Sequence, residues 1–148
     1  MIDLNLKEPR LIYETKYWRV VLSENQDYLG RCVIILKRSC KNLSSLKKEE
    51  WKDFIKLVKL LESGLKKAFD ATMFNWSCLM NDAYKSKTPN PSVHWHFRPR
   101  YNHEVKLANT TFKDPEFAHH YARERSILVS EKIRKIIISK IKDNLEIK

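Results

Sequence analysis

Glycine and long hydrophobic segments are scarce in this chain of 148 residues. Only two glycines are present, and no flexible glycine-rich linker divides the chain. No run approaches the ~18 apolar residues of a membrane-spanning helix. The start of the chain, with Asp3 and Glu8, lacks the apolar segment of a secretory signal. We therefore expect a single domain over residues 1–148 and no membrane partner.

Cysteines are few and unevenly spaced, at positions 32, 40 and 78, and they form no CxxC pair. A disulfide framework would need closer and more regular cysteines. The pattern is typical of free thiols in a reducing compartment, so a cytoplasmic location is expected.

Acidic residues are also fewer than basic residues. The 18 Asp and Glu residues stand against 29 Lys and Arg residues, which gives a net charge of +11. A basic excess of this size favours an anionic substrate or a polyanionic partner. The alternative is a compositional bias, because lysine, isoleucine and asparagine are abundant together. Apolar residues make up 43% of the chain, enough for a packed core.

Alternating and continuous apolar patterns predict three strands. Residues 17–22 alternate, with Trp18, Val20 and Leu22 on one face. Residues 32–36 form a β-branched run that we expect to be buried on both faces. Residues 72–80 are rich in aromatic and β-branched residues, which favours a further strand.

Helical spacing predicts two amphipathic helices. The first repeats apolar residues at Trp51, Phe54, Ile55, Val58, Leu61, Leu65 and Phe69. Ser44 and Ser45 are candidate caps for it. The second begins near Ser130, and the motif at 114–116, Asp-Pro-Glu, indicates another helix start. The order of elements predicts an α+β fold with an antiparallel sheet, a long amphipathic helix and a C-terminal helix.

The segment 90–101 carries most of the candidate chemistry. At strand period His94, His96 and Arg98 share one face. The opposite face, expected to lie against the core, carries Val93, Trp95 and Phe97. The two imidazoles would then stand about 7 Å apart beside a guanidinium. Imidazole suits nucleophilic attack and proton transfer at neutral pH, and guanidinium suits phosphate oxygens. The strand therefore predicts part of a site for phosphoryl chemistry.

Other interpretations of these residues stay open. The two histidines can be an exposed pair without a function, or they can bind zinc with His103, His119 or a cysteine as third ligand. Arg100 can contact phosphate or form a structural salt bridge. For the adjacent pair His119 and His120 we favour the surface of a helix.

The pattern His-x-His-x-x-Pro-Arg at residues 94–100 resembles the second half of the histidine-triad (HIT) motif, His-x-His-x-His-x-x-Pro-Arg. Aligned on the Pro-Arg pair, His94 is the middle histidine, His96 is the last, and Ser92 stands at the first position. The similarity covers roughly residues 12–101. It implies a HIT-like fold with its core over residues 10–101 and a C-terminal helical extension over 113–148.

The resemblance also implies an activity. The middle histidine, His94, would attack the α-phosphate of a nucleotide derivative, either a dinucleoside polyphosphate or a nucleoside phosphoramidate. The nucleotidyl-histidine would then be resolved by water or another acceptor. His96 would contact a phosphate or orient the leaving group, and Asn81 would donate to a phosphate oxygen. The resemblance implies no cofactor and no metal, and a homodimer as the assembly.

Three serines depart from the family pattern. Ser92 replaces the first histidine, Ser39 stands where many members carry a histidine, and Ser23 stands where an acidic or amide residue holds the ribose. We expect these serines and Arg98 to bind substrate. Two hypotheses follow: a nucleotide hydrolase or nucleotidyl transferase acting through His94, and a catalytically impaired module that binds nucleotides or RNA on the same fold.

Overall fold

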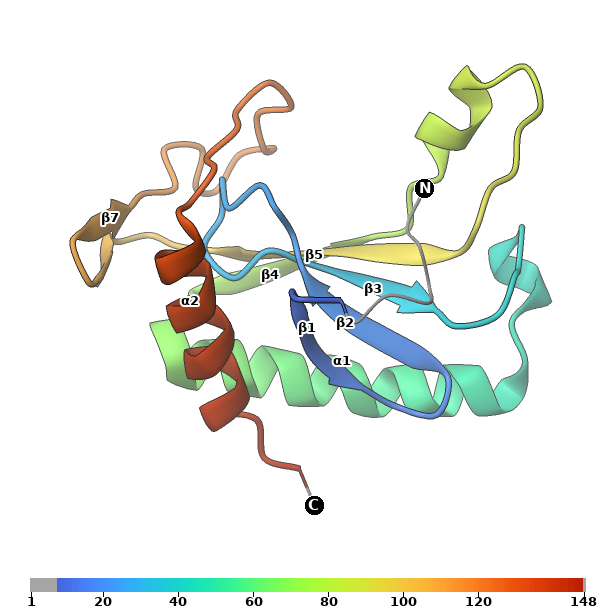
Figure 1. Ribbon diagram of the computed structural model, residues 1–148, viewed down its shortest axis with the longest axis horizontal. Coiled ribbons are helices and arrows are strands. Elements are labelled where there is room, and N and C mark those ends of the chain that lie inside the picture. The colour runs from blue at the N-terminus through green and yellow to red at the C-terminus, as the bar shows by residue number, and fades with distance from the viewer. Residues whose placement is uncertain (1–7, 148) are drawn as a thin grey trace.

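The computed structural model describes residues 8–147, so Asp3 and the rest of the segment before Glu8 lie outside the described residues. The described chain folds into a five-stranded antiparallel sheet with a long helix, α1 (Lys48–Phe69), packed along one face (Figure 1). The order across the sheet is β1-β2-β3-β5-β4. The strands are β1 (Leu11–Glu14), β2 (Trp18–Leu22), β3 (Cys32–Leu36), β4 (Met73–Ser77) and β5 (His94–Arg100). The predicted α+β class with an antiparallel sheet is confirmed.

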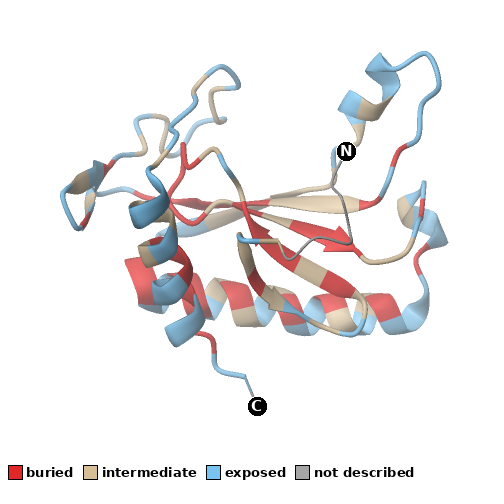
Figure 2. Ribbon diagram, in the orientation of Figure 1, coloured by how far each residue is buried: buried red, intermediate tan, exposed pale blue. Residues whose placement is uncertain are grey.

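The core lies between the sheet and α1. Apolar side chains recur along the helix at helical spacing and are buried, among them Phe54, Leu57, Leu61 and Leu65. Buried segments are concentrated on β2, β3 and the turns of α1 that face them (Figure 2). Each buried leucine contributes about 1.5–3 kcal/mol to folding. The core thus anchors one face of the sheet and leaves the other face to the loops.

The start of α1 differs from the prediction. Ser44 and Ser45 lie in a short 3₁₀ turn, η1 (Leu43–Ser45), and cap nothing. The helix begins after Lys47, whose backbone N–H donates to the carboxylate of Glu50 at 2.7 Å. Two hydrogen bonds from Arg38, at 2.5 and 2.8 Å, hold that carboxylate in place. The helix start is therefore fixed by a charged residue inside the first turn.

The C-terminal part adds a small hairpin and a second helix. Between β4 and β5 lies the 3₁₀ segment η2 (Asn81–Lys85), and the later elements are β6 (Val105–Leu107), β7 (Thr110–Phe112) and α2 (Glu131–Asp143). The helix α2 begins next to Ser130, where the sequence places its start, and the Ser130 hydroxyl caps it by accepting the Ile133 N–H at 3.3 Å. The buried Ile137 and Ile141 face inward, and α2 contacts both α1 and β1. Within residues 8–147 no helix is long and apolar enough to cross a membrane.

Three expectations about local structure were wrong. No helix starts at Asp114, because its carboxylate accepts hydrogen bonds from Arg100 at 2.7 and 3.1 Å and from the Tyr101 N–H at 3.1 Å. The pair His119 and His120 consequently lies in an exposed loop and not on a helix. The strand predicted over residues 72–80 is shorter in the structure, where β4 covers only Met73–Ser77. The sequence pattern also missed β1, which has four residues and an irregular register.

Candidate functional site

The face of β5 that points away from α1 carries the candidate residues. His94, His96 and Arg98 alternate along this face, while Val93 and Phe97 are fully buried in the core. Antiparallel pairing sets β5 between β3 and β4, one strand in from the edge of the sheet (Figure 1). The centroids of the two imidazole rings lie 4.9 Å apart, closer than the step of about 7 Å between alternate residues, because the rings lean toward each other.

The His94 ring is oriented by the main chain. Its Nδ1 lies 2.8 Å from the backbone carbonyl oxygen of Ser92. A carbonyl oxygen can only accept, so Nδ1 carries the proton in this contact and Nε2 keeps its lone pair. The position where the family pattern has a histidine is thus filled by a serine whose backbone, and not its side chain, holds the next imidazole.

His96 is neutral at physiological pH. Burial, together with the charges of His94, Arg98 and Arg31, lowers the pKa of its imidazole to about 4. Its Nδ1 is buried and has no hydrogen-bond partner within residues 8–147. A buried polar atom of this kind is expected to meet a ligand or an ordered water. His96 is therefore a neutral hydrogen-bonding group whose Nδ1 is available to a ligand.

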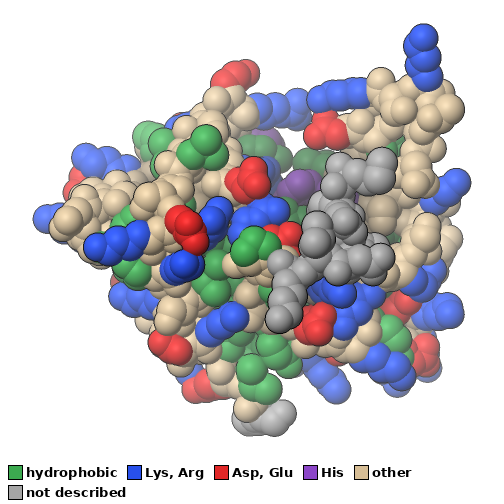
Figure 3. Space-filling view, in the orientation of Figure 1, with side chains coloured by type: hydrophobic (Ala, Val, Ile, Leu, Met, Phe, Trp, Pro, Cys, Tyr) green, Lys and Arg blue, Asp and Glu red, His purple; other side chains and the backbone are tan. Residues whose placement is uncertain are grey.

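Two hollows flank the histidines, and His96 lines both of them. The first, of about 470 Å³, lies beside β3 and brings together the expected residues Ser39, Ser92 and His94. Its walls also include the apolar side chains of Val33, Ile35, Leu36 and Pro91. Histidine side chains are visible at the bottom of a hollow in the space-filling view (Figure 3).

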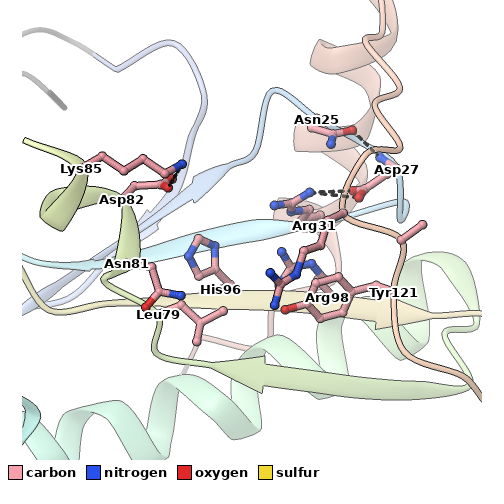
Figure 4. A pocket seen from close by; sticks show the side chains of 12 residues that line it. Asn25, Asp27, Arg31, Leu79, Asn81, Asp82, Lys85, His96, Arg98 and Tyr121 are labelled. Atoms are coloured by element: carbon pink, nitrogen blue, oxygen red, sulfur yellow. Dashed lines mark hydrogen bonds and ion pairs between the residues drawn. The ribbon is translucent and has the colours of Figure 1, made fainter.

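The second hollow, of about 460 Å³, brings Asn81 and Arg98 to the other side of His96. It is bounded by the loop at 25–31, by η2 and by the segment 121–123 (Figure 4). Ser23 lines neither hollow; it lies in a shallower one of about 280 Å³ that shares Val33 and Ile35 with the first. The structure therefore gathers six of the seven expected residues in the two hollows and leaves Ser23, which follows β2, outside them.

Arg98 and Arg100 are two residues apart and have different surroundings. The Arg100 guanidinium is bound by the Asp114 carboxylate, by the side-chain oxygen of Asn75 and by the carbonyls of Glu116 and His119. Its side chain is 2% exposed. Of the two interpretations left open for Arg100, the structure supports the structural salt bridge.

Sequence reasoning missed several residues of the second hollow. Arg31 lies just before β3 and next to Arg98 across the strand pair, which follows from the pairing of Cys32 with Phe97. No pairing between these two strands follows from the sequence alone, so the sequence offered no signal for this neighbour. Tyr121 and Arg123 come from an irregular segment after β7, and no periodicity in the sequence places that segment over the site.

The described residues do not assemble a metal site. Across 8–147, no three His, Cys, Asp or Glu side chains are gathered in a way that could hold a metal ion. His103 lies beyond β5, where its Nδ1 contacts the Asn102 side chain at 2.9 Å, and the loop of His119 is held by Arg100. The third ligand that the zinc interpretation of His94 and His96 requires is missing from this part of the chain.

The fold and sequence are similar to known proteins. A histidine-triad protein from Sinorhizobium meliloti superposes with a TM-score of 0.72 at 18% identity, covering 98% of this chain and 96% of that one. A hypothetical histidine triad nucleotide-binding protein from Sulfolobus tokodaii gives 0.70 at 17% identity, covering 93% and 83%. A Plasmodium falciparum diadenosine triphosphate hydrolase gives 0.59 at 15% identity, covering 93% and 77%. At these identities the likeness concerns the fold alone.

A search of curated proteins by sequence finds no match. The model of the HIT domain family, in contrast, matches residues 6–103, well over half of the 148 residues. The matched region contains β1 to β5 and both histidines of the site. The chain therefore belongs to the HIT family.

Proposed function

We propose that this protein is a nucleotide hydrolase or nucleotidyl transferase that attacks the α-phosphate of a nucleotide derivative through a covalent nucleotidyl-His94. The observation that carries the proposal is the 2.8 Å contact between His94 Nδ1 and the Ser92 carbonyl. In the neutral ring it puts the proton on Nδ1 and leaves the Nε2 lone pair aimed by the backbone, which is what a nucleophilic imidazole requires. Family membership and the fold it shares with a diadenosine triphosphate hydrolase support the same class of reaction.

The reaction has two displacements at phosphorus. In the first, the Nε2 lone pair forms a P–N bond while the bond from phosphorus to the leaving group breaks, and the leaving group departs with that electron pair and later takes up a proton. In the second, the oxygen of water or of another acceptor attacks the same phosphorus, loses its proton, and the P–N bond returns its pair to His94. The Ser92 carbonyl compensates the partial positive charge on the imidazole while the adduct exists.

The neighbouring groups would hold the phosphate. His96, neutral and with Nδ1 unpartnered, would contact a phosphoryl oxygen from one side, and Asn81 would donate from η2. Ser39 and Ser92 would contribute hydroxyls from the first hollow. Fixed donors of this kind stabilise the charge that develops in the transition state. Ser23 would reach the ribose only weakly, from its hollow beside Val33 and Ile35.

The cysteines and the net charge bear on where the enzyme would act and how it would capture its substrate. All three cysteines are free thiols, which supports a reducing, cytoplasmic location. No cofactor takes part in the two displacements. The substrate class is a dinucleoside polyphosphate or a related nucleotide derivative, and the net charge of +11 favours its capture through electrostatic attraction.

A direct test is to trap the adduct. Wild type, His94→Ala and the control His103→Ala are mixed with a dinucleoside polyphosphate or a nucleoside phosphoramidate labelled on the α-phosphate, quenched in base and examined by intact mass. Wild type and His103→Ala are expected to carry a nucleotidyl group, and turnover by His94→Ala to fall by at least about 100-fold. Nucleotide binding by wild type with neither adduct nor turnover would leave the alternative, a non-catalytic nucleotide- or RNA-binding module.

A further inference from the structure

Arg98 is a buried cation with no anionic partner among residues 8–147. Its side chain is 6% exposed, and within residues 8–147 its guanidinium makes no hydrogen bond and no ion pair. The Nε atom is fully buried and unsatisfied. The guanidinium carbon lies 4.0 Å from the centroid of the Tyr121 ring, which covers one side of the group (Figure 4). Leaving a charge in this state is costly, unless an anion completes the site.

The surrounding charges increase that cost. Arg31 stands across the strand pair from Arg98, and burial together with the positive charge of Arg31 lowers the pKa of Arg98. Both carboxylates in the wall of this hollow are already neutralised. Asp27 binds Arg31 at 2.9 Å, and Asp82 binds Lys85 at 2.6 Å. The charges of Arg98 and Arg123 therefore have no carboxylate partner in the wall of this cavity, and Arg98 is the buried one of the two.

The cavity continues the row of groups used in the proposed reaction. His94, His96 and Arg98 follow one another on one face of β5, and alternate residues are about 7 Å apart. His96 lines both hollows, so a phosphate beside it has the apolar hollow of Val33 and Ile35 on one side and the Arg98 cavity on the other. An apolar hollow suits a nucleoside, and a cationic cavity suits further phosphates.

We propose that the Arg98 cavity is an anion subsite for the leaving group, so that the enzyme acts on nucleotides joined to further phosphates in preference to nucleoside phosphoramidates with an uncharged amine. The inference rests on the proposed function for its reaction, but the anion site itself does not. Arg98 would bind the phosphate next to the attacked one with the two outer nitrogens of its guanidinium. Tyr121 would keep the guanidinium oriented from the opposite side.

Binding of inorganic tripolyphosphate tests the anion site without any chemistry. The full chain, Arg98→Met and the control Arg134→Met, which removes the same charge from α2 outside the cavity, are titrated by calorimetry at low salt. Arg98→Met is expected to weaken binding by at least about tenfold and Arg134→Met by less than about twofold. Unchanged affinity in Arg98→Met, or an equal loss in both variants, would overturn the proposal. If Arg98→Met does not fold, Arg98→Gln is held to the same expectation.

Kinetics test the selectivity. Adduct formation is compared for a dinucleoside polyphosphate and a phosphoramidate of the same nucleoside. The Arg98→Met change should lower kcat/KM for the polyphosphate at least about tenfold more than for the phosphoramidate. Equal losses on both substrates would contradict the subsite. Absence of any adduct in wild type would defeat the proposed function, while the tripolyphosphate titration would still decide whether Arg98 binds an anion.

Discussion

His96 lies in the candidate site, and keeping its imidazole uncharged there lowers the stability of the fold in acid. Its imidazole is held neutral by burial and by the positive groups around it, with a pKa of about 4. In an unfolded chain the same side chain titrates near 6.5. Between pH ~6.5 and ~4 the imidazole is therefore protonated in the unfolded state and not in the folded state. The free energy of unfolding consequently falls as the pH decreases through this window.

This difference is measurable by urea unfolding of wild type and His96→Asn at pH 7 and pH 4.5. Discounted for partial exposure of the ring, the shift predicts that wild type loses about 1–2 kcal/mol more than the variant on acidification. Carboxylates remote from His96 that titrate in the same range affect both proteins alike and cancel in the comparison. Identical pH dependence in the two proteins would mean that His96 is not held neutral by the fold.

Two neighbouring arginines illustrate what residue patterns can and cannot predict. The alternation of residues 93–98 predicted correctly which side chains enter the core, because a strand admits only two faces. The same pattern could not separate Arg98 from Arg100. The difference lies in Asp114, which reaches Arg100 and not Arg98, and this partner is supplied by a segment whose path no periodicity defines.

At the scale of elements, the Arg100–Asp114 pair connects the sheet to the segment after β7. The two side chains are 2% and 1% exposed, and Arg100 also donates to the backbone carbonyls of Glu116 and His119. These contacts hold the start of the segment that continues to Tyr121 over the second hollow. Removing the guanidinium would leave the buried Asp114 carboxylate with only the Tyr101 N–H as donor and would take one hydrogen bond from each of the two carbonyls.

We therefore predict that Arg100→Met destabilises the protein by about 3–5 kcal/mol. The loss is measured by chemical denaturation, with Arg134→Met, on α2, as the matched control and an expected effect below about 0.5 kcal/mol. Adding Asp114→Asn to Arg100→Met should restore part of the loss, since no charge then remains buried. A loss below about 1 kcal/mol for Arg100→Met would show that the pair does not hold this segment.

The elements themselves were predictable to different degrees. The apolar repeats of α1 and α2 extend over several turns, and both helices are present where the sequence indicates them. The exact start of α1 was not predictable. It depends on the Glu50 carboxylate, which Arg38 holds from just beyond β3, and not on a capping serine. The motif at 114–116 fails for a related reason: tertiary contacts recruit the side chain that a local rule assigns to a cap.

At the scale of the whole molecule, the sheet has an open edge at β4. This strand pairs with β5 on one side only, and within the described residues no strand pairs with its other side. Met73 on β4 is 37% exposed, and Leu79, just after the strand, is 39% exposed. A second copy related by a two-fold axis would cover this edge and extend the sheet. We propose that the homodimer implied by the family resemblance forms through β4.

Sedimentation equilibrium tests this assembly. Wild type is expected at twice the chain mass of 17.7 kDa, and Met73→Glu should raise the dimer dissociation constant by at least about tenfold because it sets a charge in the interface. Leu128→Glu, at a side chain that is 76% exposed and away from β4, is the control and should leave the dimer intact. A monomeric wild type, or a Met73→Glu variant that dimerises as tightly, would rule out this edge.

The hydrogen bond from His94 to the Ser92 carbonyl also bears on how such sequences evolve. A carbonyl oxygen belongs to every residue, so mutation at position 92 can change the side chain while the imidazole stays aimed. The orientation of the nucleophile thus tolerates a change of side chain at the first position of the triad, whereas the second position must stay histidine. A count of the histidines in a degenerate motif would therefore underestimate how many related proteins keep a usable nucleophile. The geometry of the backbone before the middle histidine is the better criterion.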